Sequence, residues 1–171
     1  MRMTTCAKLW PMPPHPSRDR ASALAEQTAP LLVLDTNVVL DWVAFGDPRV
    51  RPIVAAIESG ALRPVTSAAC LAELRRALGY PEVKLDAAAQ ALALARYVAH
   101  AILFEVPVSD APANLPRCED PDDRKFLELA WHSGASHLLT RDKSLLKLSR
   151  GVAALGRFSV LAPHEFEPPR Q

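Results

Sequence analysis

Short aliphatic runs alternate along this chain with longer segments whose apolar residues recur every three or four positions. The clearest run, Leu31 to Asp35, places four aliphatic residues directly before a carboxylate. Continuous apolar runs of this length are typical of strands buried on both faces of a parallel sheet. Similar runs predict strands at residues 61–66, 102–106 and 136–140, with an edge strand at 158–161. Pro64 weakens the second of these, because proline cannot donate a backbone hydrogen bond.

The segments between the strands carry the spacing of amphipathic helices. Helices are predicted at residues 38–42, 50–59, 68–78, 86–100, 121–133 and 143–149. Asp120 is the expected N-cap of the fifth helix, and Pro121 occupies its first position. Strands that alternate with helices imply a parallel sheet of about four to five strands covered by helices on both faces, which is a three-layer α/β/α fold.

Length and composition fit one globular domain, because 171 residues with 49% hydrophobic content can bury a substantial core. The net charge of +1 gives no global basic field, so any contact with nucleic acid must come from a local patch. The three cysteines show neither zinc-ligand nor disulfide spacing. No stretch resembles a membrane span or a secretory signal, so the sequence favours a cytoplasmic protein.

Three regions are expected along the chain. Residues 1–30 contain five prolines and no hydrophobic periodicity, which indicates a disordered extension outside the fold. This extension is interpreted either as a flexible tail or as the result of a start codon assigned too far upstream. Residues 31–162 form the predicted domain, and residues 163–171 form a short polar tail.

Four carboxylates stand where a strand passes into a loop or helix, or one turn into such a helix: Asp35, Glu73, Asp123 and Asp142. In a parallel sheet these positions can converge on the crevice outside the carboxyl ends of the strands. Carboxylates held close together repel one another, and one pKa rises unless a cation neutralises them. Oxygen ligands suit a hard ion such as Mg²⁺ or Mn²⁺. Such an ion can activate water for the hydrolysis of a phosphodiester bond.

Each acid also has an ordinary structural interpretation. Asp35 could start a turn, and Glu73 could be a solvated helical residue. The cluster of Asp120, Asp122 and Asp123 suits helix capping and the helix dipole. The joint pattern is more specific than any single member, because it requires several acids at one edge of the sheet.

Four motifs, in this order, resemble those of PIN-domain ribonucleases: Leu-Asp-Thr-Asn-Val-Val, Thr-Ser-xxx-Leu-Ala-Glu, Asp-Pro-Asp-Asp-Arg-Lys-Phe-Leu-Glu-Leu-Ala and Leu-Leu-Thr-Arg-Asp-Lys-Ser-Leu-Leu. The resemblance covers residues 31–161 and extends to the VapC-like toxins of bacterial type II toxin–antitoxin operons. It implies a PIN-like α/β fold and an Mg²⁺- or Mn²⁺-dependent endoribonuclease that hydrolyses RNA. It also implies an antitoxin protein that neutralises the nuclease, and a homodimer.

Carried over by position, the resemblance assigns the metal-binding and catalytic roles to Asp35, Glu73, Asp123 and Asp142. The family's third acid usually stands three residues before a pair of apolar helix residues, which selects Asp123 and leaves Asp120 as the second choice.

Neighbouring polar residues would support these acids. Thr36, Asn37 and Thr140 are placed to orient carboxylates or water by hydrogen bonds. Basic residues beside the acids could contact the RNA backbone, or could be solvated charges at helix ends. These basic residues are Arg124, Lys125, Arg141 and Lys143.

Two other functions compete with the nuclease. A phosphatase of the haloacid dehalogenase type also begins with an aspartate after an apolar strand. Its chemistry needs a second aspartate two residues later as general acid, whereas this chain has Asn37, which has no titrating proton to donate. The other alternative is a PIN fold that binds RNA or a protein without cleavage, and it predicts metal-independent RNA binding. All four acidic positions are filled, so the sequence gives no sign of an inactive site.

Overall fold

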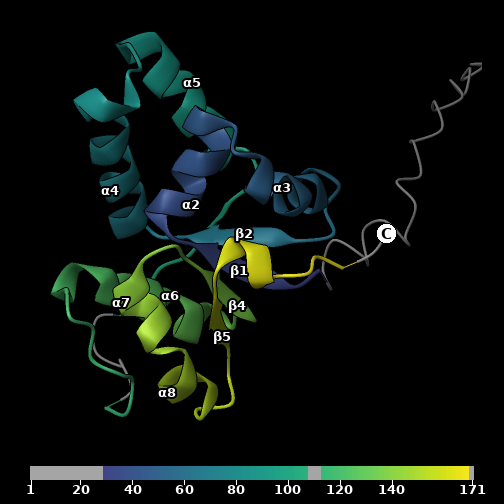
Figure 1. Ribbon diagram of the computed structural model, residues 1–171, viewed down its shortest axis with the longest axis vertical. Coiled ribbons are helices and arrows are strands. Elements are labelled where there is room, and N and C mark those ends of the chain that lie inside the picture. The colour runs from purple at the N-terminus through teal and green to yellow at the C-terminus, as the bar shows by residue number, and fades with distance from the viewer. Residues whose placement is uncertain (1–28, 108–112, 170–171) are drawn as a thin grey trace, which may run out of the picture.

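The centre of the fold is a sheet of five parallel strands in the order β3-β2-β1-β4-β5 (Figure 1). The strands are β1 (Leu31–Leu34), β2 (Arg63–Thr66), β3 (Ile102–Leu103), β4 (His137–Leu139) and β5 (Ser159–Leu161). This computed structural model describes residues 29–107 and 113–169. The extension expected at residues 1–30 lies almost wholly outside the described residues and stays a prediction, as do the expected domain boundaries.

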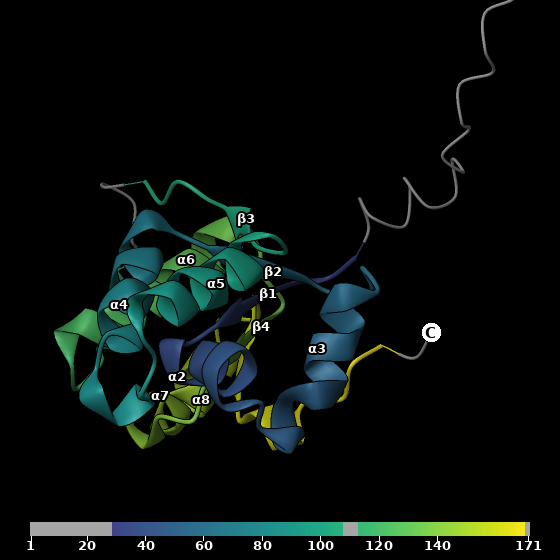
Figure 2. The same ribbon diagram turned by 90° about the horizontal axis from the view of Figure 1, so that it is seen from above.

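Helices cover both faces of the sheet, which confirms the three-layer α/β/α fold (Figures 1 and 2). One layer contains α2 (Thr36–Leu40), α3 (Arg51–Glu58), α4 (Ala68–Leu78) and α5 (Ala87–Val98), and the other contains α6 (Arg124–Ser133), α7 (Lys143–Lys147) and α8 (Ser149–Ala153). A π-helical turn, Asp41–Phe45, follows α2 directly, and 3-10 turns occur at Pro48–Val50, Pro81–Val83, Pro121–Asp123 and Pro163–Glu165. None of the described helices has the length and apolarity needed to cross a bilayer.

Successive residues of β1 pack into two different hydrophobic clusters. Leu32 and Leu34 belong to the cluster formed with α2 to α5, whereas Val33 belongs to the cluster formed with α6 to α8. Both faces of the strand are therefore covered, which explains the unbroken aliphatic run before Asp35. Burial of each such side chain contributes about 1.5–3 kcal/mol. The carboxyl end of β1 is thus a well-anchored base for the residues that follow it.

Pro64 lies in a strand with neighbours on both sides, although proline favours sheet edges. The N–H of Arg63 donates to the carbonyl oxygen of Pro30, so the amide of Arg63 faces the β1 side. Amides alternate in direction along a strand, so the nitrogen of Pro64 faces the β3 side. Pairing with β3 begins only at Val65. No donor is lost at Pro64, and β2 therefore tolerates the proline.

The helix after β1 begins at Thr36, two residues earlier than the hydrophobic pattern indicated. The backbone carbonyl of Asp35 accepts hydrogen bonds from the N–H groups of Val38 at 2.9 Å and Val39 at 3.0 Å. Asp35 therefore ends the strand segment and also serves as the N-cap of α2. As a consequence, Thr36 and Asn37 lie in the first turn of the helix, immediately beside the Asp35 carboxylate.

The third strand is shorter, and the last helical segment longer, than the sequence indicated. β3 contains only Ile102–Leu103 and pairs with β2 alone, as an edge strand. The helix expected at residues 143–149 is replaced by two helices, α7 and α8. Gly151 disfavours a helix in the sequence, but it allows a close approach, because a Cβ at this position would lie 3.2 Å from Cγ of Pro116.

Candidate active site

Asp35 is a nearly buried carboxylate, with 4% of its surface exposed. Its Oδ2 atom accepts hydrogen bonds from Oγ1 of Thr140 at 2.5 Å and from Nδ2 of Asn37 at 2.6 Å. Burial raises the pKa of the Asp35 carboxyl above its ordinary value, and the charge of Glu73 raises it further, against the opposing effect of the two hydrogen bonds. The site therefore favours a positive charge near Asp35.

Thr140 connects Asp35 to the next acid along the sheet. Its Oγ1 donates to Asp35 and also accepts a hydrogen bond from the backbone N–H of Asp142 at 2.9 Å. The carboxylate of Asp142 caps α7, because its Oδ1 accepts from the N–H of Ser144 at 2.5 Å and from the hydroxyl at 2.6 Å. These bonds from Ser144 hold the pKa of Asp142 below its ordinary value. Asp142 is thus an ionised carboxylate in a fixed position.

Asp123 comes from the opposite layer, at the N-cap position of α6. Its pKa is raised to about 6, first by partial burial and then by the negative charges of Asp35, Asp142 and Asp120. Asp120 has a different role, because it is exposed and its Oδ1 accepts from the N–H of Asp122 at 2.8 Å. This is the N-cap role expected for Asp120 from the sequence.

Glu73 lies on α4 and forms an ion pair with Lys125 on α6. The pair joins the two helical layers at the carboxyl edge of the sheet. Both side chains are one-fifth exposed, so the pair is only partly screened by solvent. The charge of Glu73 is also close enough to Asp35 to raise the pKa of that residue.

A cavity of about 280 Å³ collects the four predicted acids. Its lining residues come from α2, α4, the end of the 3-10 turn before α6, and the start of α7: Asp35, Thr36, Asn37, Leu40, Glu73, Arg76, Ala77, Tyr80, Asp123 and Asp142. Asp120 does not line it. Thr140 is fully buried and supports Asp35 through its hydroxyl. The structure therefore brings Asp35, Glu73, Asp123 and Asp142 together.

The chemistry of this cavity fits a hard divalent cation. Its acidic donors are all carboxylate oxygens, and mutual repulsion raises the pKa of Asp123. Within residues 29–107 and 113–169, no three His, Cys, Asp or Glu side chains already stand close enough to ligate one ion. Binding a cation would therefore draw the carboxylates together, and Glu73 would exchange its partner Lys125 for the ion.

Sequence reasoning missed Asp41, which is 3% exposed and lies in the π-helical turn. Nη1 of Arg141 contacts both carboxylate oxygens of Asp41 at 2.6 Å. The backbone N–H of Arg141 donates to Oδ1 of Asn37 at 3.1 Å. Arg141 therefore ties the loop after β4 to α2. A signal was present in the sequence, because Asp41 follows three aliphatic residues directly and a buried carboxylate needs a cationic partner.

The other basic residues considered for RNA contact have different surroundings. Arg124 forms an ion pair with Glu128 at 2.7 Å, and Lys125 is engaged by Glu73. Lys143 is exposed and forms no ion pair with the described part of the chain. The role of these residues in RNA binding stays a prediction.

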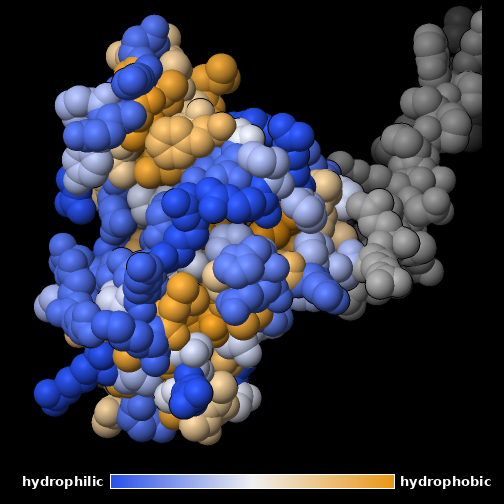
Figure 3. Space-filling model, viewed as in Figure 1, coloured by the Kyte–Doolittle hydropathy of each residue, from blue (hydrophilic) through white to orange (hydrophobic). Residues whose placement is uncertain are grey.

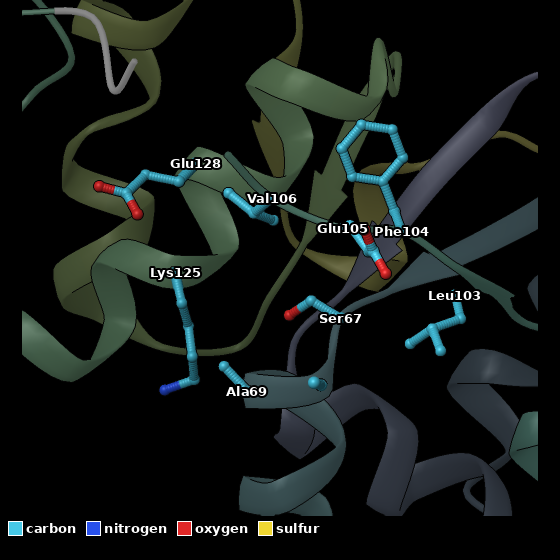
Figure 4. Close-up of a pocket in the computed structure, with 9 residues that line it drawn as sticks. Ser67, Ala69, Leu103, Phe104, Glu105, Val106, Lys125 and Glu128 are labelled. Carbon is cyan, nitrogen blue, oxygen red and sulfur yellow. The ribbon is translucent and has the colours of Figure 1, made fainter. Parts of the chain in front are cut away.

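A larger cavity, of about 520 Å³, lies between the start of α4, the chain around β3, and α6 (Figure 4). Leu103, Phe104 and Val106 make it largely apolar, and its charged residues are Glu105, Lys125 and Glu128. In Figure 4, Lys125 extends along one side of the cavity toward Ala69. The cavity does not contain the acids of the strand ends. The smaller cavity is therefore the better candidate for the active site, despite its size.

The fold and the acidic cavity define an α/β protein with a cluster of carboxylates at the carboxyl edge of a parallel sheet. The family model described as the PIN domain matches residues 31–144, and the chain belongs to the PIN-domain family, whose members are nucleases. The family expected from the four motifs is thus confirmed.

Comparison with solved structures supports the fold. A chain from the crystal structure of VapBC2 from Rickettsia felis, bound to a DNA fragment from their promoter, matches with a TM-score of 0.55 and 13% sequence identity. The alignment covers 77% of this chain and 98% of that chain. No curated protein matches the sequence.

Proposed function

We propose that this protein is an Mg²⁺- or Mn²⁺-dependent endoribonuclease that acts as the toxin of a toxin–antitoxin pair in the cytoplasm. Its partners are an RNA substrate, an antitoxin protein and a second copy of the chain. Membership of a nuclease family and the likeness to a chain of VapBC2 support this proposal. The observation that carries it is the single cavity lined by Asp35, Glu73, Asp123 and Asp142.

In this proposal, Asp35, Asp123 and Asp142 hold the cation, with Glu73 as a further ligand. A bound cation supplies two effects, activation of water and stabilisation of negative charge on the phosphoryl group. The protein contributes the placement of the ligands. Thr140 and Asn37 orient the Asp35 carboxylate through hydrogen bonds, and such partners fix both the direction and the basicity of a ligand.

The environment of Asn37 counts against a phosphatase of the haloacid dehalogenase type. A general acid must hold a proton that it can transfer. The amide of Asn37 instead donates to Asp35 and accepts from the backbone N–H of Arg141. Asn37 therefore acts as an orienting residue in this geometry. A PIN fold that binds without cleavage is the remaining alternative, and the following experiment separates it from the nuclease.

Cleavage of a labelled RNA mixture is measured for the wild type and for Asp35→Asn, with Mg²⁺, with Mn²⁺ and with a chelator. We expect the wild type to cleave only with the metal, and Asp35→Asn to lose at least about a hundredfold in rate, because a ligand charge is removed at constant shape. Asp86→Asn is the matched control, because Asp86 caps α5 outside the cavity and Asn retains the capping function.

Cleavage by Asp35→Asn at the wild-type rate would refute the assignment, and metal-independent RNA binding without cleavage would favour the non-catalytic alternative. The toxin role is tested separately. Expression of the wild type should arrest bacterial growth, whereas expression of Asp35→Asn should not. Coexpression of a protein encoded beside the gene should restore growth and should copurify with the nuclease.

A further inference from the structure

One exposed aromatic ring lines the acidic cavity, and a second lines a neighbouring cavity. Tyr80, which follows α4, is 48% exposed and lines the cavity itself. Phe45, at the end of the π-helical turn, is 54% exposed and lines a second cavity of about 380 Å³. A ligand that enters either cavity would therefore meet the face of an exposed aromatic ring.

The two cavities are neighbours, because Asn37, Leu40 and Asp142 line both of them. We call the two together the groove. Tyr80 is at the part lined by the acids, and Phe45 is at the other part. Each cavity therefore contributes one aromatic ring that does not line the other.

Each aromatic ring shares its cavity with an arginine. Arg76 lines the cavity of Tyr80, and Arg141 lines the cavity of Phe45. Arg141 is held by Asp41 through Nη1, yet 45% of its side chain stays exposed. The guanidinium group is therefore fixed in position before a ligand arrives, which reduces the entropy lost on binding.

The other large exposed hydrophobic side chains are chemically different. Leu92 and Val98 on α5 and Leu103 in β3 are aliphatic, and none of them lines either cavity of the groove. Figure 3 shows hydrophobic residues gathered over the upper helices, which include α4 and α5. Among the exposed large hydrophobic residues of the described chain, the two aromatic ones are thus the two at the groove.

An aromatic ring beside an arginine suits one unpaired nucleotide. Bases stack on exposed rings whatever their sequence, and arginine binds the phosphate by paired hydrogen bonds. A base inside a duplex is already stacked and paired, so it cannot cover a protein ring without being flipped out. Such a groove would therefore favour single-stranded over double-stranded nucleic acid.

We propose that the groove is a binding site for single-stranded RNA, in which the bases on either side of the scissile phosphate stack on Phe45 and Tyr80. Arg141 and Arg76 contact the phosphates of those nucleotides. The proposal rests on the proposed nuclease function, because it places the scissile phosphate at the acids. It adds two aromatic residues that determine the substrate class.

The test measures binding of a fluorescent single-stranded RNA octamer to Asp35→Asn protein, which is blocked in cleavage, by fluorescence anisotropy with Mg²⁺ present. Phe45→Leu and Tyr80→Leu each remove a ring while keeping an apolar side chain. We expect each to weaken binding by about five- to a hundredfold. Phe45→Trp, which keeps a stacking surface, should bind within about threefold of the parent.

Leu92→Ala is the matched control, because Leu92 is exposed but lies outside the groove. It should bind the octamer as the parent does. An RNA duplex of the same sequence should bind at least about tenfold more weakly than the single strand, without dependence on Phe45. In cleavage assays, Phe45→Leu should raise KM for the octamer more than it lowers kcat.

Unchanged affinity in both Phe45→Leu and Tyr80→Leu would overturn the proposal. Equal affinity for the duplex would also overturn it. Aromatic-dependent binding of the octamer in a wild type that cleaves no RNA would support the groove and reject only the nuclease. Failure of the groove proposal and failure of the nuclease proposal therefore give different results.

Discussion

At the scale of single residues, the site depends on how the protein stabilises the buried carboxylate of Asp35. A carboxylate with 4% exposure loses most of its hydration, which costs several kcal/mol unless other groups compensate. Thr140 and Asn37 supply two hydrogen bonds to the same oxygen. These hydrogen bonds do not fully offset the loss of hydration, so the pKa of Asp35 is raised. The hydrogen bonds thus orient the carboxylate, and a cation would complete its compensation.

Thr140→Val should damage both stability and function. Valine has the shape of threonine but no hydroxyl, so Asp35 loses a donor and the N–H of Asp142 loses an acceptor. We expect the free energy of unfolding to fall by about 1–3 kcal/mol, measured by urea denaturation, and the affinity for Mg²⁺ to fall at least about tenfold. Thr140→Ser should restore the affinity for Mg²⁺. If valine is tolerated without loss of Mg²⁺ affinity, Thr140 has no orienting role.

Asp123→Asn should stabilise the metal-free protein at neutral pH while abolishing cleavage. The pKa of Asp123 is raised from 3.8 to about 6, so the folded state binds the proton more tightly than the unfolded state. Stability is therefore lost as the pH rises from about 4 to 6, and it stays reduced above pH 6. Because Asp123 is partly exposed, removal of its charge should raise the free energy of unfolding by only about 1 kcal/mol at pH 8.

Urea denaturation in a chelator, at pH 5 and at pH 8, checks this prediction. The advantage of Asp123→Asn over the wild type should be larger at pH 8 than at pH 5. An equal or smaller advantage at pH 8 would show that burial and the neighbouring charges do not raise the pKa of Asp123.

At the scale of elements, the backbone at the start of α6 distinguishes the roles of Asp120 and Asp123, which the sequence alone left open. Asp120 and Asp123 both suit the beginning of a helix, and both precede apolar residues. The 3-10 turn Pro121–Asp123 places Asp120 outside, where it caps the turn, and Asp123 inside, where it meets the other acids. The local backbone geometry thus distinguishes a structural carboxylate from a candidate ligand.

Asp120→Ala should therefore lower stability without removing activity. Loss of an N-cap side chain costs about 0.5–2 kcal/mol, visible as a lower thermal midpoint, because the N–H of Asp122 loses its acceptor. Asp120→Asn keeps a capping oxygen and should match the wild type in stability. Both variants should cleave RNA within about threefold of the wild-type rate at a temperature where they are folded. Loss of cleavage in Asp120→Asn would instead make Asp120 the third acid.

The sequence predicted the position of every strand of the sheet, most clearly that of β1, because a strand covered on both faces must be continuously apolar. It also placed Asp35 and Asp142 at the carboxyl ends of strands, because those positions depend only on where a strand stops. It could not predict the pairing of Glu73 with Lys125 or of Asp41 with Arg141. Each pair joins residues from different elements, so its geometry follows from how the layers pack rather than from local pattern.

At the scale of the whole molecule, the acidic cavity lies between the two helical layers, at the carboxyl edge of the sheet. Glu73 comes from the layer of α2 to α5, and Asp123 from the layer of α6 to α8 (Figure 1). The charges of Asp35 and Asp142 repel the Asp123 carboxylate, which opposes the closure of this edge, and the ion pair of Glu73 with Lys125 holds the two layers together. A divalent cation would link the two layers more strongly than the ion pair does.

Mg²⁺ should therefore raise the thermal midpoint of the whole domain and not only support cleavage. A ligand that binds only the folded state adds RT ln(1 + [L]/Kd), or about 2.7 kcal/mol at a hundredfold excess over Kd, which corresponds to a rise of several degrees. Calorimetry should show this rise in the wild type and little of it in Asp35→Asn. The rise should be larger at pH 8 than at pH 5, because protons compete with the cation for Asp123 below its pKa of about 6. An equal rise in both proteins would mean that the ion binds elsewhere, since loss of a buried ligand charge must weaken a site that spans the two layers.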